Sequence, residues 1–151
     1  MQTKHFLLAL SLFCTSICFA QNKIFEKYAD MDNVTSVYIS KAMFQMMPTI
    51  EKVGVNLMNL KGKIESLQLV SSENKDRIAQ MKKDFSQLVT SQHQELMRIK
   101  EENTRVHFYS NIKNDQVKEL LMLVDSDDNY VAILLSGNFT LKDIQEIADG
   151  M

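Results

Sequence analysis

The sequence predicts a single α+β domain in which an antiparallel-rich β-sheet has helices packed on it. Before residue 95, segments with helical spacing of apolar residues alternate with strand-like segments, and from Glu95 onward the apolar period changes from 3.6 to 2. The strand-like segments of the second half follow one another through short polar turns, which favours antiparallel pairing. A chain of 151 residues with 4 Gly and 1 Pro fits one domain.

Residues 1–20 have the pattern of a secretory signal peptide. Lys4 is their one formal charge, residues 6–19 are predominantly apolar, and Ala20 precedes the polar Gln21. The apolar stretch is shorter than the roughly 20 residues of a membrane-spanning helix. We therefore expect cleavage after Ala20, an exported domain of residues 21–151, and no transmembrane span after cleavage.

Both cysteines of the chain, Cys14 and Cys18, lie within this leader. Bulky residues, Phe13 and Ile17, precede them where a lipidation site needs small ones, so we expect no lipid anchor. The mature domain is then free of cysteine, which excludes a disulfide, a Cys-ligated zinc site and a Cys nucleophile. The formal net charge of −2 argues against a nucleic-acid binder driven by overall charge.

The first half of the mature domain predicts helices and strands in alternation. We expect a short helix over residues 24–29, a strand over 34–39, and a helix over 41–47 that Ser40 caps and Pro48 ends. Residues 49–63 have helical spacing weakened by Gly54 and Gly62. A strand over 64–70 follows, and then a helix of about five turns. One apolar stripe runs along that helix, formed by Ile78, Met81, Phe85, Leu88 and Val89.

The second half predicts four strands and a closing helix. The strands span residues 96–100, 105–112, 117–124 and 130–135. The last two are continuously apolar, so we place them in the centre of the sheet with both faces covered, by the chain's own helices or by a second subunit. Thr140 and Asp143 form a start resembling a capping box. The helix that follows has Leu141, Ile144 and Ile147 at helical spacing and ends near Gly150.

The segment over residues 96–112 predicts a hairpin with one apolar and one basic face. A two-residue turn at 102–103 pairs Glu101 with Thr104, and the apolar residues then oppose one another, Ile99 with Val106 and Met97 with Phe108. The opposite face has Arg98, Lys100, Arg105, His107 and Tyr109. This basic hairpin face is the candidate binding site, for an acidic protein surface, a lipid headgroup or a sugar acid. The alternative is a solvated face whose charges meet Glu95, Glu101 and Glu102.

Other motifs give weaker indications of a site. Residues 125–129 begin like a calcium loop but have Tyr130 where the loop needs Gly, so we interpret them as a solvated turn. The methionines of the helix over 41–47 are soft ligands suited to Cu(I), but we expect them to fill the core instead. His93 is expected at the end of the long helix and His107 in a strand, without the spacing of a zinc pair. We predict no catalytic residue, no metal ligand and no cofactor.

Three blocks of the sequence together resemble a known family. They are residues 25–44, residues 62–69, and residues 121–124 completed by residues 137–144. The chain resembles domain-of-unknown-function family 4252, small exported bacterial proteins. The resemblance implies an α+β domain behind a signal peptide in the Gram-negative envelope, either periplasmic or secreted. It implies no activity and no functional residues. Genes of the family tend to lie near envelope-stress or sigma-factor genes, which hints at a role in regulation.

Three classes of function remain open at this point. The first is a non-enzymatic envelope domain that binds a partner or takes part in envelope signalling. The second is an envelope hydrolase or isomerase, which a deep polar pocket enclosing two carboxylates, or one with His107, would favour. The third is a small-ligand or copper carrier, which bound metal would reveal. The sequence leaves the oligomeric state open.

Overall fold

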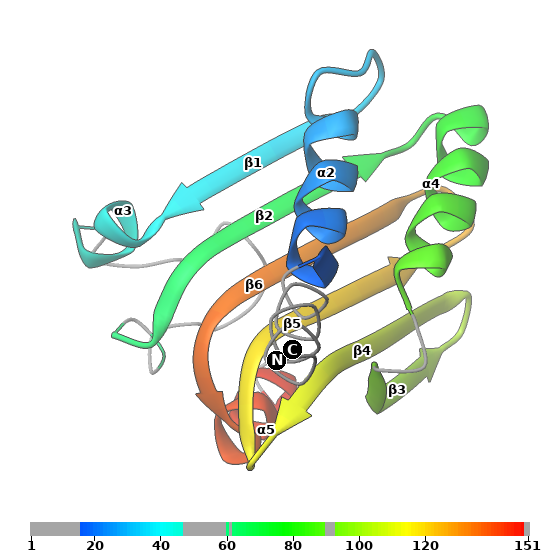
Figure 1. Ribbon diagram of the computed structural model, residues 1–151. Helices are drawn as coiled ribbons and strands as arrows, with labels where there is room; N and C mark the ends of the chain where they lie inside the picture. Colours follow the sequence, from blue (N-terminus) through cyan, green and yellow to red (C-terminus); the bar gives the residue numbers. More distant parts are fainter. Residues whose placement is uncertain (1–15, 47–59, 61, 90–92, 150–151) are drawn as a thin grey trace, which may run out of the picture.

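One antiparallel sheet of six strands organises the molecule (Figure 1). The computed structural model describes residues 16–46, 60, 62–89 and 93–149. The strands lie side by side in the order β1-β2-β6-β5-β4-β3. Their bounds are β1 Thr35–Ser40, β2 Ile64–Ser72, β3 Gln94–Glu101, β4 Thr104–Lys113, β5 Gln116–Asp125 and β6 Tyr130–Thr140. The predicted antiparallel α+β fold is confirmed, and β5 and β6 occupy the predicted central positions.

Four helices accompany the sheet in the described part of the chain. They are α2 Ser16–Ala29, α3 Lys41–Met46, α4 Lys75–Leu88 and α5 Leu141–Asp149. The helix predicted over 24–29 ends as expected but begins at Ser16, ahead of the predicted cleavage point. The expected helical spacing over 49–63 falls mostly outside the described residues. No helix among the residues described is both long enough and apolar enough to cross a membrane.

The strand alternation divides the apolar side chains between two cores, one on each face of the sheet. On the face that Figure 1 presents, α2 and α4 cover the sheet with Phe25, Tyr28, Met81 and Phe85, all at most 2% exposed. On the opposite face, Phe44 of α3 and Ile144 and Ile147 of α5 join a second core. Because β5 and β6 supply side chains to both cores, their continuously apolar sequences are explained.

Local sequence sets the ends of several helices. Asn74 caps α4, since its Oδ1 accepts hydrogen bonds from the backbone N–H groups of Asp76 and Arg77 at 3.1 and 3.2 Å. α4 ends at Leu88, and Val89, which was expected in the apolar stripe of this helix, is its C-cap. At α5 the predicted box is confirmed: Thr140 N–H donates to Asp143 Oδ2 at 2.7 Å and Asp143 N–H to Thr140 Oγ1 at 3.2 Å.

Two expectations about the last strand and the last helix are wrong. The last strand was expected to end at residue 135, yet β6 continues to Thr140, because Ile64 opposite Gly137 and Val117 opposite Phe139 prolong the pairing on both sides. Leu141, expected in the apolar stripe of the last helix, is 45% exposed. It is the first residue of α5, and the buried side of this helix begins at Asp143 and Ile144.

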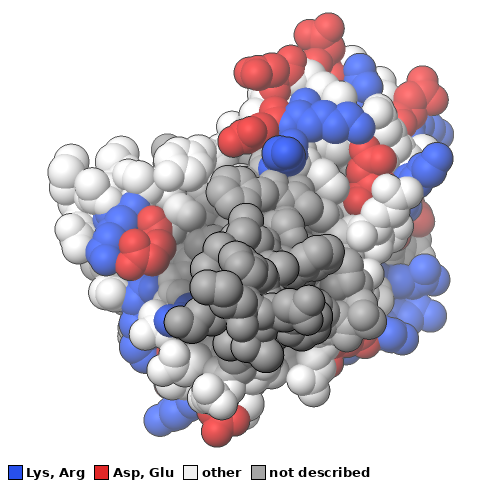
Figure 2. All heavy atoms as spheres, viewed as in Figure 1, with Lys and Arg blue, Asp and Glu red and all other residues white. Residues whose placement is uncertain are grey.

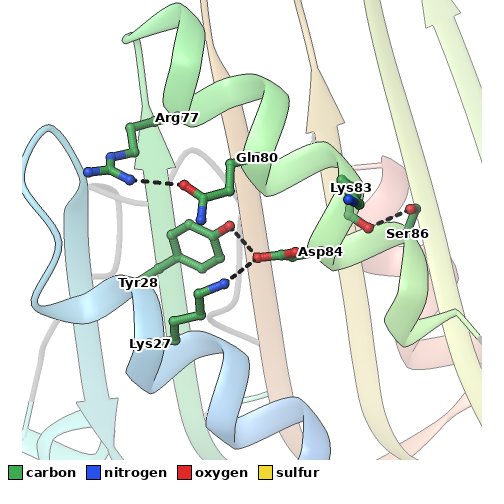
Figure 3. A network of polar contacts seen from close by, with 7 residues as sticks. All are labelled: Lys27, Tyr28, Arg77, Gln80, Lys83, Asp84 and Ser86. Carbon is green, nitrogen blue, oxygen red and sulfur yellow. Dashed lines mark hydrogen bonds and ion pairs between the residues drawn. The ribbon is translucent and has the colours of Figure 1, made fainter.

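A polar cluster joins the two helices that share a face (Figure 3). Tyr28 Oη donates to Asp84 Oδ2 at 2.7 Å, and Lys27 Nζ lies 2.7 Å from the same oxygen. Both bonds lower the pKa of Asp84, that of Lys27 the more. Burial, reinforced by the Asp84 carboxylate, raises the pKa of Tyr28. The cluster fixes α2 against α4 above the sheet.

Candidate functional site

The hairpin of β3 and β4 has the predicted register. Glu101 pairs with Thr104 across a tight turn in which Glu102 has a φ of 47°, in the left-handed region. The apolar pairs follow as expected, Ile99 with Val106 and Met97 with Phe108. Both of these pairs belong to the core on the other face of the sheet, away from α2 and α4. The apolar face of the hairpin is therefore confirmed.

The basic hairpin face lies on the same side of the sheet as α2 and α4. Its members alternate with the apolar pairs, and two of them align with buried leucines of β5: His107 opposite Leu123 and Tyr109 opposite Leu121. Both leucines belong to the core beneath α2 and α4. Arg98 lies opposite His107 and Lys100 opposite Arg105, so all five predicted residues share one face. Their binding role stays a prediction.

A β-bulge adds Glu95 to this face. With strict alternation, Glu95 would lie on the same face as Ile99 and Met97, toward the core that lies away from α2 and α4. The register shifts between Glu95 and Met97, however, so that Glu95 lies opposite Tyr109. The sequence predicts Glu95 as a charge partner of this face, but nothing in residues 95–97 indicates the bulge that brings it there.

Glu95 neutralises part of the basic hairpin face. Its carboxylate lies 2.8 Å from Arg98 Nη2 and 3.2 Å from His107 Nδ1. These hydrogen bonds, first that of Arg98 and then that of His107, lower the pKa of Glu95. The His107 and Tyr109 rings stack with centroids 5.8 Å apart and planes 3° apart. Glu95, Arg98, His107 and Tyr109 thus interact with one another, and they form the inner half of the face.

The outer half of the face consists of two cations, Lys100 and Arg105, which no carboxylate of the described residues neutralises. Lys100 and Arg105 are exposed, and their side chains form no hydrogen bond or ion pair with any described residue. Asp125, opposite Arg105 on β5, is bonded instead to Lys82 of α4, with Nζ and Oδ1 2.6 Å apart. Figure 2 shows Lys and Arg atoms gathered on the side of the molecule where Figure 1 places β3 and β4.

A separate polar cavity of about 400 Å³ lies near the start of α4. It is lined by Asn33, Val34, Thr35, Ser71, Ser72, Glu73, Asn74 and Asn129. Glu73 is the single carboxylate of this lining, and His107 is not part of it. The lining therefore lacks the pair of carboxylates, or the His107, that was expected of a hydrolase or isomerase site.

The other residues considered as metal ligands or catalytic groups do not come together into a site in the described part of the chain. Within the described ranges, no three His, Cys, Asp or Glu side chains are placed to share a metal ion. Residues 126–129 form a turn closed by a 3.0 Å bond from Ser126 N–H to the Asn129 carbonyl, as expected. His93 precedes β3 instead of ending the long helix, because α4 already ends at Leu88.

The expectation that the methionines fill the core is wrong for the two that the structure describes. Met43 is 48% and Met46 75% exposed, whereas Phe44 between them is buried. α3 has only six residues, and their spacing of three puts both methionines on one side of it while Phe44 takes the side that faces the core. Met47 lies outside the described residues.

The structure defines a single α+β domain built on an antiparallel sheet, and a comparison with known proteins assigns it to a family. The model of the family described as Domain of unknown function (DUF4252) matches residues 28–147. The chain belongs to this family. No curated protein and no solved structure matches the chain. The match runs from Tyr28 of α2 to Ile147 of α5 and includes the hairpin.

Proposed function

We propose that this chain is a non-enzymatic binding module of the bacterial envelope, which takes an acidic surface of a partner protein on its basic hairpin face. One observation carries the proposal. Glu95 is already engaged by Arg98 and His107, while Lys100 and Arg105 remain exposed cations without a side-chain partner among the described residues. Charged groups placed in this way steer an oppositely charged partner and set its register.

An acidic protein surface fits this face better than a lipid surface does. Lipid headgroup binding relies on clusters of about four to eight basic residues, usually beside apolar anchors that enter the membrane. The face offers the three cations Arg98, Lys100 and Arg105 and one carboxylate. The large apolar side chains that are exposed, such as Tyr38, Met43 and Met46, lie on other elements.

Export of the module is supported by residues 1–20, whose single charge, apolar stretch and small residue before Gln21 are typical of a cleaved leader. Phe25 and Tyr28, the α2 residues of the core, both follow the expected cleavage point. Cleavage there leaves the packing of α2 on the sheet in place. We expect the protein recovered from the envelope to begin at Gln21, which intact-mass measurement tests.

The test of partner binding is a charge reversal at the exposed end of the face. Lys100→Glu combined with Arg105→Glu is expected to abolish recovery of the partner from envelope extracts by affinity capture. Raising the salt concentration should weaken recovery by the wild type, because exposed charges are screened. Neither the wild type nor the double variant should sediment with vesicles of phosphatidylcholine and phosphatidylglycerol.

A matched control separates the site from overall charge. Lys75→Glu with Lys142→Glu makes the same change of charge on exposed residues in the first turns of α4 and α5, where a carboxylate suits the helix dipole. This variant should recover the partner as the wild type does. Equal recovery by the hairpin variant, or binding of the wild type to the anionic vesicles alone, would show that the proposal is wrong.

A further inference from the structure

The two edges of the sheet differ in their defence against pairing with another strand. An edge strand presents unpaired N–H and C=O groups, and proteins protect such edges with charged residues, Pro or bulges. β3 has Glu95, Arg98, Lys100 and Glu101 among its residues, as well as a bulge. β1 has the sequence TSVYIS, with no charge and no Pro, and it pairs with β2 in continuous register from Thr35 to Ser40.

The exposed apolar side chains gather at the β1 edge. Tyr38 is 66% exposed on the side of α2, and Val37 is 37% exposed on the other side. Met43 and Met46 are exposed on α3, which begins directly after β1. Four of the five large apolar residues that are exposed in the described part of the chain therefore belong to this one edge and the helix that continues it.

We propose that β1 is a self-association edge, where β1 strands of two copies of this chain pair antiparallel about a two-fold axis at Tyr38. In a symmetric antiparallel pair, opposed residues must lie on the same face, so the axis falls on a residue and not between two residues. An axis at Tyr38 opposes residues 36 to 40 of each copy and extends the sheet from one copy into the other. This inference is independent of the function proposed for the basic hairpin face.

The strand is complementary to itself in that register. Tyr38 meets Tyr38 of the second copy on the α2 side, flanked by Ser36 opposite Ser40. Val37 lies opposite Ile39 on the other face, where Ile39 is already part of the core. Aromatic and β-branched pairs of this kind stabilise neighbouring strands. The same register brings the start of the second copy's strand beside α3, where Met43 and Met46 are exposed.

The first test is the oligomeric state of the exported protein, measured by native mass spectrometry and sedimentation over a range of concentrations. The wild type should show a dimer that dissociates on dilution. Tyr38→Lys should be monomeric at every concentration, because it places two like charges opposite each other at the axis. Its melting temperature should equal that of the dilute, monomeric wild type, since association raises the melting temperature only of the dimer. Gln94→Lys, an equal change on an exposed residue of the other edge strand, should leave the dimer intact.

The second test fixes the register by cross-linking. In a background with Cys14→Ser and Cys18→Ser, Tyr38→Cys provides a sole thiol that faces its own copy across the axis, within disulfide range. Oxidation should give a covalent dimer. Ser36→Cys lies on the same face but opposes Ser40, so it should stay monomeric. A wild type that is monomeric at all concentrations, a Tyr38→Lys dimer, or equal cross-linking of both cysteine variants would overturn the proposal.

Discussion

Gly137 holds a position in β6 where the backbone of another segment leaves no room for a side chain. A Cβ there would collide with the carbonyl oxygen of Lys63 and with the ring of Phe139. The neighbouring Asn138 N–H donates to that same carbonyl at 3.0 Å, so the two segments cannot simply separate. The close approach joins the start of β2 to the end of β6.

Gly137→Ala should therefore lower the free energy of unfolding by about 1–3 kcal/mol, the usual cost of overpacking a buried position. Urea unfolding followed by circular dichroism measures it. Gly62→Ala is the matched control, since a Cβ at Gly62 meets no atom within 4 Å. Its effect should stay within about 0.5 kcal/mol. Similar losses in the two variants would contradict the steric explanation.

Residue-level prediction from the sequence succeeded where the interaction is local. The Thr140–Asp143 box and the Ser40 cap, which accepts from Met43 N–H at 3.4 Å, each depend on residues three apart. It failed where a distant segment decides the outcome. The role of Gly137 depends on Lys63, far away in the chain, and so no local pattern announces it.

At the scale of elements, the attachment of α2 to α4 depends on one shared carboxylate. Tyr28→Phe keeps the ring, which stacks on Phe85 with centroids 5.6 Å apart, but removes the hydroxyl that donates to Asp84. A hydrogen bond to a charged group contributes more than a neutral one, so we expect a loss of about 1–2 kcal/mol in the free energy of unfolding.

Ser86→Ala is the control for this change, because Ser86 Oγ donates only to the Lys83 carbonyl of its own helix and is exposed. Thermal and urea unfolding of both variants give the comparison. We expect the Ser86 variant to stay within about 0.5 kcal/mol of the wild type. A Tyr28→Phe protein as stable as the wild type would mean that Lys27 alone satisfies Asp84.

Most elements could be predicted because their apolar period is strong, and the exceptions have identifiable causes. The register of β3 with β4 followed from a two-residue turn and one apolar face, both readable in the sequence. The extension of β6 to Thr140 could not be predicted, because residues 136–138 have the composition of a turn. Neighbouring strands hold these residues extended. The bulge before Met97 escaped prediction for the same reason: pairing, not propensity, sets it.

For the whole molecule, the two-sided sheet explains why the candidate site lies at one end. α2 and α4 cover the presented face over β2, β6 and β5 (Figure 1), whereas polar and charged side chains of β3 and β4 occupy the same face beyond them. The basic hairpin face and the β1 edge are at opposite sides of the sheet. Self-association through β1 would therefore leave both hairpin faces open to a partner.

Each face of the sheet also has a helix carboxylate that links stability to pH, Asp84 on one face and Asp143 on the other. Hydrogen bonds from Lys27 and then Tyr28 lower the pKa of Asp84 in α4. Burial acts to raise the pKa of Asp143 in α5, but bonds from Lys63, at 2.7 Å, and from Thr140 outweigh it, so this pKa is lowered too. In each case the folded state binds the proton less readily than the unfolded state does.

Stability from these two groups is therefore fully present above the unfolded-state pKa of about 3.9 and is lost as the pH falls through the lower folded-state values. Urea unfolding between pH 7 and pH 3 should show a decline that begins near pH 4. Asp84→Asn and Asp143→Asn should each be less stable than the wild type at pH 7 but decline less steeply in acid, because one linked proton is gone. If either variant loses stability with the same slope as the wild type, that carboxylate does not hold the lowered pKa that its bonds imply.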